Sequence, residues 1–221
     1  AIIKGTGANA AKKFTALKAT ADSLDFVGID EDVVKFDLKG IQIEFSQASG
    51  AAAQTGPQIN FAQSPGGGFD IFTGGPTLRL DYSTGLIRAS ADLVTLGLGD
   101  FVFLQGAFAF EKSGPTTFKL QNGQSVTANV LAIGGSGIDA FAGLGPYFID
   151  SDGDGVIEPE DARDPNAVGL AIENLTFGLG IFKETTGIRQ FAAMKGTADS
   201  ITPLGLPSEL HPAPPVNSGP V

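Results

Sequence analysis

The sequence predicts an all-β protein made of antiparallel strands. Apolar and polar residues alternate through most of the periodic stretches, as they do in strands with one buried face. Short turns rich in Gly, Asn and Ser separate these stretches, and helical patterns are scarce. We expect an antiparallel β-sandwich or an extended β-meander with long loops. A parallel β-solenoid is less favoured, because no short repeat of about 20 residues is visible.

The first clear strand pattern lies in residues 34–46. Apolar residues occupy the even positions from 34 to 38 and the odd positions from 41 to 45, so the alternation reverses at Gly40. A glycine at such a reversal indicates a β-bulge or a tight bend. Three more strands are predicted at residues 78–82, 86–96 and 101–111, and the short turns between them predict antiparallel neighbours.

The second half of the chain continues this pattern. Further strands are expected at residues 116–121, 125–133, 168–182 and 189–201. The third of these is expected to break near Asn174, and the Gly-Gly-Ser-Gly stretch at 134–137 has the composition of a linker. The only helical candidates are residues 8–13 and a short turn that begins at Pro159.

Composition divides the chain into three parts. We expect an N-terminal segment at residues 1–13, a β-rich repeat domain at 14–201 and a Pro-rich, extended tail at 202–221. Within the domain, residues 47–68 predict a long loop because they are rich in Gly, Ala and Gln. The chain has 221 residues, of which 42% are hydrophobic, so it can bury a substantial core.

The charge balance narrows the classes of partner. With 24 acidic and 14 basic residues the net charge is −10, which disfavours nucleic acids and anionic membranes and suits divalent cations. The absence of cysteine excludes disulfides and thiolate metal sites. No apolar run reaches the roughly 18 residues of a membrane-spanning helix. Because Ala1 opens the sequence without a leader, we expect a removed leader or a piece of a longer protein.

The most specific motif is the acidic segment FIDSDGDGVIEPEDA at residues 148–162. A calcium-binding loop of about twelve residues supplies oxygen ligands from positions 1, 3, 5, 7, 9 and 12, with glycine at position 6. Counted from Asp150, the candidate ligands are Asp150, Asp152, Asp154, the carbonyl of Val156, Glu158 and Asp161. Gly155 takes position 6. The spacing therefore predicts a Ca²⁺ site, and Mg²⁺ fits so many carboxylates less well.

Two features distinguish this segment from an EF-hand. Asp161 is shorter than the glutamate usual at position 12, so Glu160 is a competing ligand and the calcium affinity stays open. The flanking residues include Gly and Pro and predict strands rather than helices. We expect bound calcium to lock the connection between Tyr147 and the strand near Val168. A solvated acidic turn without a cation is the alternative.

Other acidic residues are weaker candidates. Asp30, Glu31 and Asp32 form either a second calcium site or a solvated turn, and the turn is favoured. Asp70 and Asp139 lie close to glycines and are expected to be turn residues rather than metal ligands.

A repeat connects the two ends of the chain. Residues 14–29 (FTALKATADSLDFVGI) and 191–206 (FAAMKGTADSITPLGL) are identical at eight of sixteen positions, at an offset of 177. Strands of one sheet can resemble each other because they draw on few residue types. The shared Thr-Ala-Asp-Ser run, in register with a lysine, is more specific than that. The preferred interpretation is a tandem repeat of about 177 residues whose next copy begins near residue 191.

Three phrases carry a resemblance to a known class of protein: residues 14–29, residues 100–112 (DFVFLQGAFAFEK) and residues 145–156 (GPYFIDSDGDGV). The chain resembles the tandem-repeat units of giant bacterial cell-surface proteins that are predicted to be calcium-binding and adhesin-like. The resemblance covers roughly residues 14–201. It implies an extracellular, all-β unit with a structural or adhesive role, and it supplies no catalytic residue. The tail beyond Leu206 departs from it, so a covalent repeat and a separate subunit both stay open.

We expect no enzymatic activity. His211 is the only histidine and lies in the tail, which excludes Ser-His-Asp chemistry and multi-histidine metal sites. A calcium-dependent carbohydrate-binding module that recognises surface glycans is the alternative, although the chain has no Trp and only Tyr82 and Tyr147. The preferred function is a structural or adhesive subunit of an extracellular surface protein or fibre, stabilised by calcium. Strand addition would join it end to end to adjacent repeats or copies.

Overall fold

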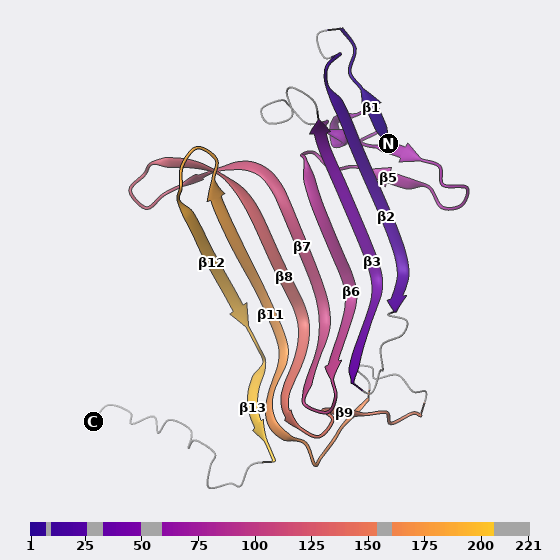
Figure 1. The fold of residues 1–221 in the computed structure, drawn as a ribbon, viewed down its shortest axis with the longest axis vertical. Coiled ribbons are helices and arrows are strands. Elements are labelled where there is room, and N and C mark those ends of the chain that lie inside the picture. Colours follow the sequence, from indigo (N-terminus) through magenta and orange to yellow (C-terminus); the bar gives the residue numbers. More distant parts are fainter. Residues whose placement is uncertain (8–9, 26–32, 50–58, 154–160, 206–221) are drawn as a thin grey trace.

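A computed structural model gives the fold and describes residues 1–7, 10–25, 33–49, 59–153 and 161–205 (Figure 1). The strands are β1 (Ile2–Lys4), β2 (Lys13–Asp25), β3 (Val34–Ser49), β4 (Phe69–Ile71), β5 (Leu78–Leu80), β6 (Leu86–Leu98), β7 (Val102–Lys119), β8 (Ser125–Leu144), β9 (Phe148–Ile149), β10 (Ala162–Arg163), β11 (Val168–Glu184), β12 (Gln190–Thr197) and β13 (Ser200–Leu204). All pairings between them are antiparallel, so the predicted fold class is confirmed. No helix in the described ranges is long and apolar enough to cross a membrane.

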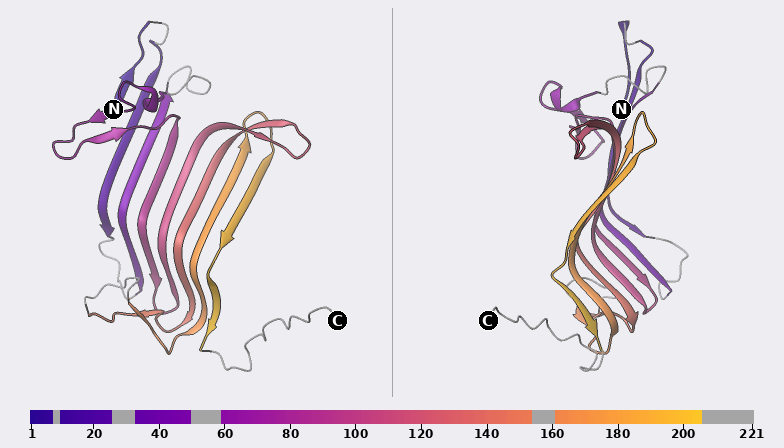
Figure 2. Two further views of the ribbon diagram at one scale, coloured as in Figure 1. Left: turned by 180° about the vertical axis from the view of Figure 1, so that it is seen from behind. Right: turned by 90° about the vertical axis from the view of Figure 1, so that its left-hand side faces the viewer.

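One nine-stranded sheet forms most of the molecule. Its order is β1-β2-β3-β6-β7-β8-β11-β12, and β13 follows β12 along the edge of β11. Strands that are close in sequence are neighbours in space, so the sheet is an extended meander. Figure 2 shows that it is strongly twisted. The small sheets β4–β5 and β9–β10 lie toward its two opposite ends and add a second layer only there.

At one end, residues 59–82 cover the large sheet through a compact apolar cluster. Its buried members are Ala16, Phe61, Leu80, Tyr82 and Leu86. The rings of Phe61 and Tyr82 meet edge to face, with 5.3 Å between their centroids. Phe61 opens a short 3-10 turn, Phe61–Gln63, so part of the predicted loop at 47–68 is an ordered cover for the sheet. Residues 50–58 of that loop lie outside the described residues.

The prediction of three neighbouring strands at 78–82, 86–96 and 101–111 is wrong for the first of them. β5 pairs with β4, whereas β6 and β7 pair with each other as predicted. The short turn after Tyr82 therefore leads from the small sheet into the large one. A short turn favours a hairpin, but here burial of Leu80 and Tyr82 against the large sheet decides the arrangement.

β7 and β8 are longer than the sequence predicts. β7 continues through residues 112–115, where a break between two strands was expected. β8 continues through residues 134–137, so the Gly-Gly-Ser-Gly stretch is strand rather than linker. Gly134 and Gly135 are paired with both β7 and β11, so ladder hydrogen bonds hold this glycine-rich backbone extended. Gly114 and Pro115 form an irregularity in β7 between Ser113 and Thr116, which are paired with β8.

A row of irregular residues crosses the large sheet near its middle. Gly40 in β3, Gly137 in β8 and Asn174 in β11 have positive φ angles of 64°, 59° and 49°. Asn174 donates its backbone N–H to Asp139 Oδ1 at 3.0 Å and its amide Nδ2–H to Asp199 Oδ2 at 2.9 Å. The irregularities predicted at Gly40 and Asn174 are thus present, although β11 continues past Asn174. Asp139 lies in a strand and not in a turn, which corrects the prediction.

The structure corrects three further predictions. Asp70 also lies in a strand, β4, where its Oδ1 is 2.7 Å from Nη1 of Arg79. Residues 10–12 form a turn and an extended segment instead of a helix, because β2 begins at Lys13. The strand content continues to Leu204, beyond the predicted start of the tail. Residues 8–9, the turn at Pro159 and residues 206–221 lie outside the described residues.

Candidate metal centre and sheet edges

The acidic segment lies in the connection between β8 and β11, and an aromatic cluster fixes its base. Tyr147 and Phe148 are buried, at 2% and 5% exposure. The Tyr147 ring stacks on Phe141 of β8 with 5.2 Å between centroids. The guanidinium carbon of Arg163 lies over the Tyr147 ring, 5.7 Å from its centroid, and Nη1 of Arg163 lies 2.5 Å from Oε1 of Glu173 in β11. The base of the loop is therefore attached to the large sheet.

Strand pairing at this base brings the two ends of the acidic segment together. β9 and β10 pair with Ile149 opposite Ala162 and Phe148 opposite Arg163. Residues 150 and 161 directly follow and precede this pairing, so the first and twelfth loop positions become neighbours. The pairing explains how carboxylates that are eleven positions apart in the sequence come close enough to share one cation.

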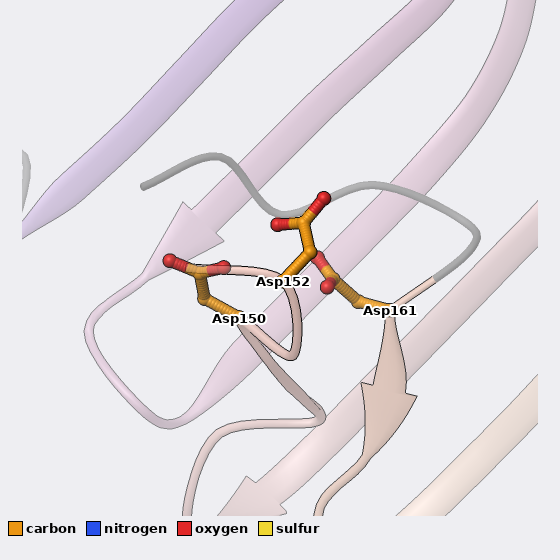
Figure 3. Close-up of side chains that lie close together, drawn as sticks. All are labelled: Asp150, Asp152 and Asp161. Carbon is orange, nitrogen blue, oxygen red and sulfur yellow. The ribbon is translucent and has the colours of Figure 1, made fainter. Parts of the chain in front are cut away.

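Asp150, Asp152 and Asp161 lie close together at this point (Figure 3). Each offers one carboxylate oxygen, and these three oxygens lie within 4.8 Å of one another. The backbone N–H of Gly153 donates to Asp150 Oδ1 at 2.6 Å. Asp161 Oδ1 accepts from the N–H and the Oγ–H of Ser151 at 2.9 and 3.0 Å. These hydrogen bonds hold two of the three carboxylates in position.

This geometry suits a hard divalent cation. Calcium binds oxygens at about 2.3–2.6 Å, so two of its ligand oxygens can be at most about 5 Å apart. Three carboxylates this close repel one another unless a cation or solvent screens them. The cluster could therefore hold a metal ion through oxygen ligands, and its carboxylates alone do not select among the oxygen-preferring metals.

The structure brings together three of the six predicted ligands. The other three, Asp154, Val156 and Glu158, lie outside the described residues, as does the competing ligand Glu160. The weaker candidates Asp30, Glu31 and Asp32 lie outside them as well. Asp70 and Asp139 are away from this cluster, in β4 and β8, and bond to Arg79 and Asn174.

A ladder of alternating charges crosses four strands at the other end of the sheet. The sequence analysis did not predict it. Lys18 of β2 lies 3.1 Å from Glu44 of β3, which lies 2.8 Å from Arg88 of β6. Arg88 in turn lies 2.7 Å from Glu111 of β7. The hydrogen bond to Glu111, with the charges of both glutamates, raises the pKa of Arg88. Each of these residues occupies a polar position in a strand of alternating polarity. Which of them pair with each other depends on the register between the strands, which the sequence does not give.

Both tyrosines are buried. The Tyr82 hydroxyl lies 3.3 Å from the carbonyl oxygens of Leu17 and Phe45, so it donates to one of them. Burial, together with the charges of Glu44 and Asp81, raises the pKa of Tyr82 to about 12. Burial also raises the pKa of Tyr147. Neither ring is available as an exposed platform for stacking on a sugar.

The repeated sequence lies near both edges of the large sheet: in β2, which has only the short β1 on its outer side, and in β12 and β13 at the other edge. Residues 14–25 of the first copy lie in β2, and residues 191–204 of the second copy form most of β12 and β13. β1 pairs with β2 at Phe14, as β11 pairs with β12 at Phe191. Each copy is thus the second strand of a similar hairpin. The two copies also point in the same direction, because an even number of antiparallel steps separates them.

No known protein family, curated protein or solved structure matches this chain.

Proposed function

We propose that this chain is a non-catalytic structural or adhesive unit of an extracellular bacterial surface protein or fibre. Adjacent units join end to end through the edges of the large sheet, and a cation in the acidic loop stabilises each unit. The observation that supports this most directly is the presence of one repeated strand near both edges of one sheet. A sheet with related edges can continue from unit to unit without a new kind of contact.

The shape of the sheet also supports a structural role. Open sheet edges usually carry charges, bulges or covers that prevent association. β12 has no described strand on its outer side, and β2 has only the short β1 there, at Lys13–Thr15. Long edges of this kind are suited to association with another strand.

We further propose that the cation is Ca²⁺ and that its role is to fix the connection between β8 and β11. The three described carboxylates supply part of the six to eight oxygens that calcium requires. A cation at this point would tie β9 to β10 and so complete the cover over Phe141 and Tyr147. The site would act as a structural stabiliser and not as a catalytic centre.

The test combines light scattering with thermal unfolding, in Ca²⁺ and in a chelator. We expect assemblies that persist in both conditions, with a melting temperature about 5–10 °C higher when calcium is about 100-fold above its Kd. Asp152→Ala should remove this calcium-dependent shift. Asp100→Ala, which removes an exposed carboxylate from the turn between β6 and β7, should retain it.

Other outcomes would contradict parts of this proposal. A monodisperse monomer at all concentrations would contradict end-to-end joining. Assemblies that fall to monomer in the chelator would place the cation at the joint between units rather than inside one. An unchanged melting temperature would contradict the calcium site. The carbohydrate-binding alternative is less favoured, because both tyrosines are buried.

A further inference from the structure

The similarity between the two copies of the repeated strand is concentrated on one of their faces. At the alternate positions 14, 16, 18, 20 and 22 of β2, all five residues are identical to their counterparts 177 positions later. At the intervening positions 15, 17, 19, 21 and 23, only two of five are identical. The repeated strand has therefore kept one complete face, which includes Ala16 and Lys18 in β2 and Ala193 and Lys195 in β12.

In β2 this face has specific partners. Ala16 is 4% exposed and belongs to the apolar cluster with Phe61 and Tyr82. Lys18 lies 3.1 Å from Glu44, whose side chain is 3% exposed. This face of β2 thus contacts β3 and residues 59–82.

In β12, Ala193 and Lys195 lack such partners within the described part of the chain, whereas Asp199 of the same face accepts from Asn174 Nδ2 of β11 at 2.9 Å. Ala193 and Lys195 are exposed, and Lys195 lies opposite Gly178 of β11, which offers no side chain. Lys195 takes part in no ion pair between described residues. At Ala193 and Lys195 the retained face therefore matches the surroundings that Ala16 and Lys18 have beside β3, and β11 offers no equivalent partners for these two residues.

We propose that β12–β13 of one copy takes the place of β2 in a second copy of this chain. This inference rests on the proposed function and specifies its joint. Lys195 would then pair with Glu44 of the second copy, and Ala193 would lie under its Phe61 and Tyr82. β12 and β2 run in the same direction, so the incoming strand is antiparallel to β3, as β2 is. Between copies of the same orientation, direct contact between β12 and an intact β2 would instead place two parallel strands in an antiparallel sheet.

The energetic balance is compatible with such an exchange. The incoming strand makes the ladder hydrogen bonds that β2 gives up, and it stays paired with β11 on its other side. The displaced β2 loses its pairing with β3 and keeps its hairpin with β1, so one ladder replaces another. The edge strand β12 gains a partner on its outer side in the process.

The absence of cysteine allows a direct test by disulfide formation in the full chain. Thr15 lies opposite Gln47 in β2–β3, and Ala192 is its counterpart in the second copy of the repeat. Differently tagged Gln47→Cys and Ala192→Cys chains are mixed and oxidised in calcium. Both positions are exposed, so neither substitution disturbs a core. A matched mixture of Leu17→Cys and Met194→Cys chains reports direct contact between the intact edges.

We expect the first mixture to give about tenfold more heterodimer than the second, since a disulfide requires Cα atoms within about 7 Å. Lys195→Glu, added to the Ala192→Cys chain, should reduce this yield because it places a carboxylate against Glu44. Lys119→Glu, at an exposed end of β7, should not reduce it. Assemblies that form without the first cross-link, or with only the second, would overturn the exchange but leave the proposed function intact. Monomers alone, without any cross-link, would overturn both.

Discussion

Glu44 is the residue on which the charge ladder depends. Its side chain is 3% exposed and accepts from both Lys18 and Arg88. A buried carboxylate is stable only when its partners compensate for the loss of water. The two cations therefore hold Glu44 in the sheet, and Glu44 in turn fixes the register of three adjacent strands.

Neutralising Glu44 should be costly. We expect Glu44→Gln to lower the free energy of unfolding by about 3 kcal/mol, because it leaves two cations beside a neutral, buried side chain. Glu111→Gln is the matched control at the more exposed end of the ladder, where the side chain is 34% exposed. It should cost about 1 kcal/mol or less. Urea unfolding measures both, and equal costs would contradict the role of burial.

Ionisation of the Tyr82 hydroxyl should lower the stability of the fold at alkaline pH. Its pKa is about 12 in the folded chain and about 10 in the unfolded chain, so folding favours the protonated hydroxyl. This contribution is fully present below pH 10 and is lost as the pH rises through 12.

Substitution of Tyr82 separates this effect from the titration of other groups. Tyr82→Phe should remove that part of the pH dependence of the unfolding free energy between about pH 10 and 12. Tyr147→Phe, at the opposite end of the sheet, should retain the contribution of Tyr82. Parallel pH profiles for the wild type and Tyr82→Phe would show that the Tyr82 hydroxyl is not held protonated by the fold.

At the scale of strands, the row of irregular residues shapes the sheet. Gly40 has a φ of 64°, and a Cβ at this position would lie 2.3 Å from Oδ2 of Asp92 in the neighbouring strand β6. Both the backbone angle and the available space therefore require glycine. The row allows long strands to bend without ending.

A pair of glycine substitutions tests this requirement. Gly40→Ala should destabilise the chain by about 2 kcal/mol, through the positive φ and the displacement of Asp92. Gly178→Ala in β11 is the matched control, because a Cβ there meets nothing within 4 Å and its φ is not positive. It should be neutral or slightly stabilising, since alanine restricts the unfolded chain. Thermal unfolding of both variants provides the comparison.

The strands themselves show how far the sequence can predict the fold. Alternation correctly located β3, β6 and the antiparallel β6–β7 pair, because a strand with two unlike faces has a period of two. It failed at residues 134–137 and 112–115, where glycine and proline resemble breaks but neighbouring strands hold the backbone. It also failed for β5, whose partner is chosen by a buried cluster and not by the length of a turn.

The candidate sites also differ in whether the sequence alone could predict them. The clustering of Asp150, Asp152 and Asp161 could be predicted from their spacing, because the ligand pattern of a calcium loop is local in sequence. The charge ladder could not be predicted from the sequence, because its residues come from four strands and are brought together only by the register between those strands. The repeat was visible in the sequence, but its place near both edges of one sheet required the strand order.

At the scale of the whole molecule, the described residues form two separate apolar clusters instead of a single central core. One includes Phe61 and Tyr82, and the other includes Phe141 and Tyr147. Between them, stability comes mainly from pairing of each strand with its two neighbours. Substitutions in the two clusters should therefore have nearly additive effects.

The even number of strands in the repeating unit has a consequence for any larger assembly. The strands β2, β3, β6, β7, β8 and β11 form one unit, after which β12 begins again in the direction of β2. At about 4.8 Å per strand, units joined in this way would advance by about 29 Å. All acidic loops would then line one rim of the ribbon and all β4–β5 hairpins the other, as their positions at opposite ends in Figure 1 imply. Such a ribbon would be polar, with chemically different growing ends and one rim able to take up a row of cations.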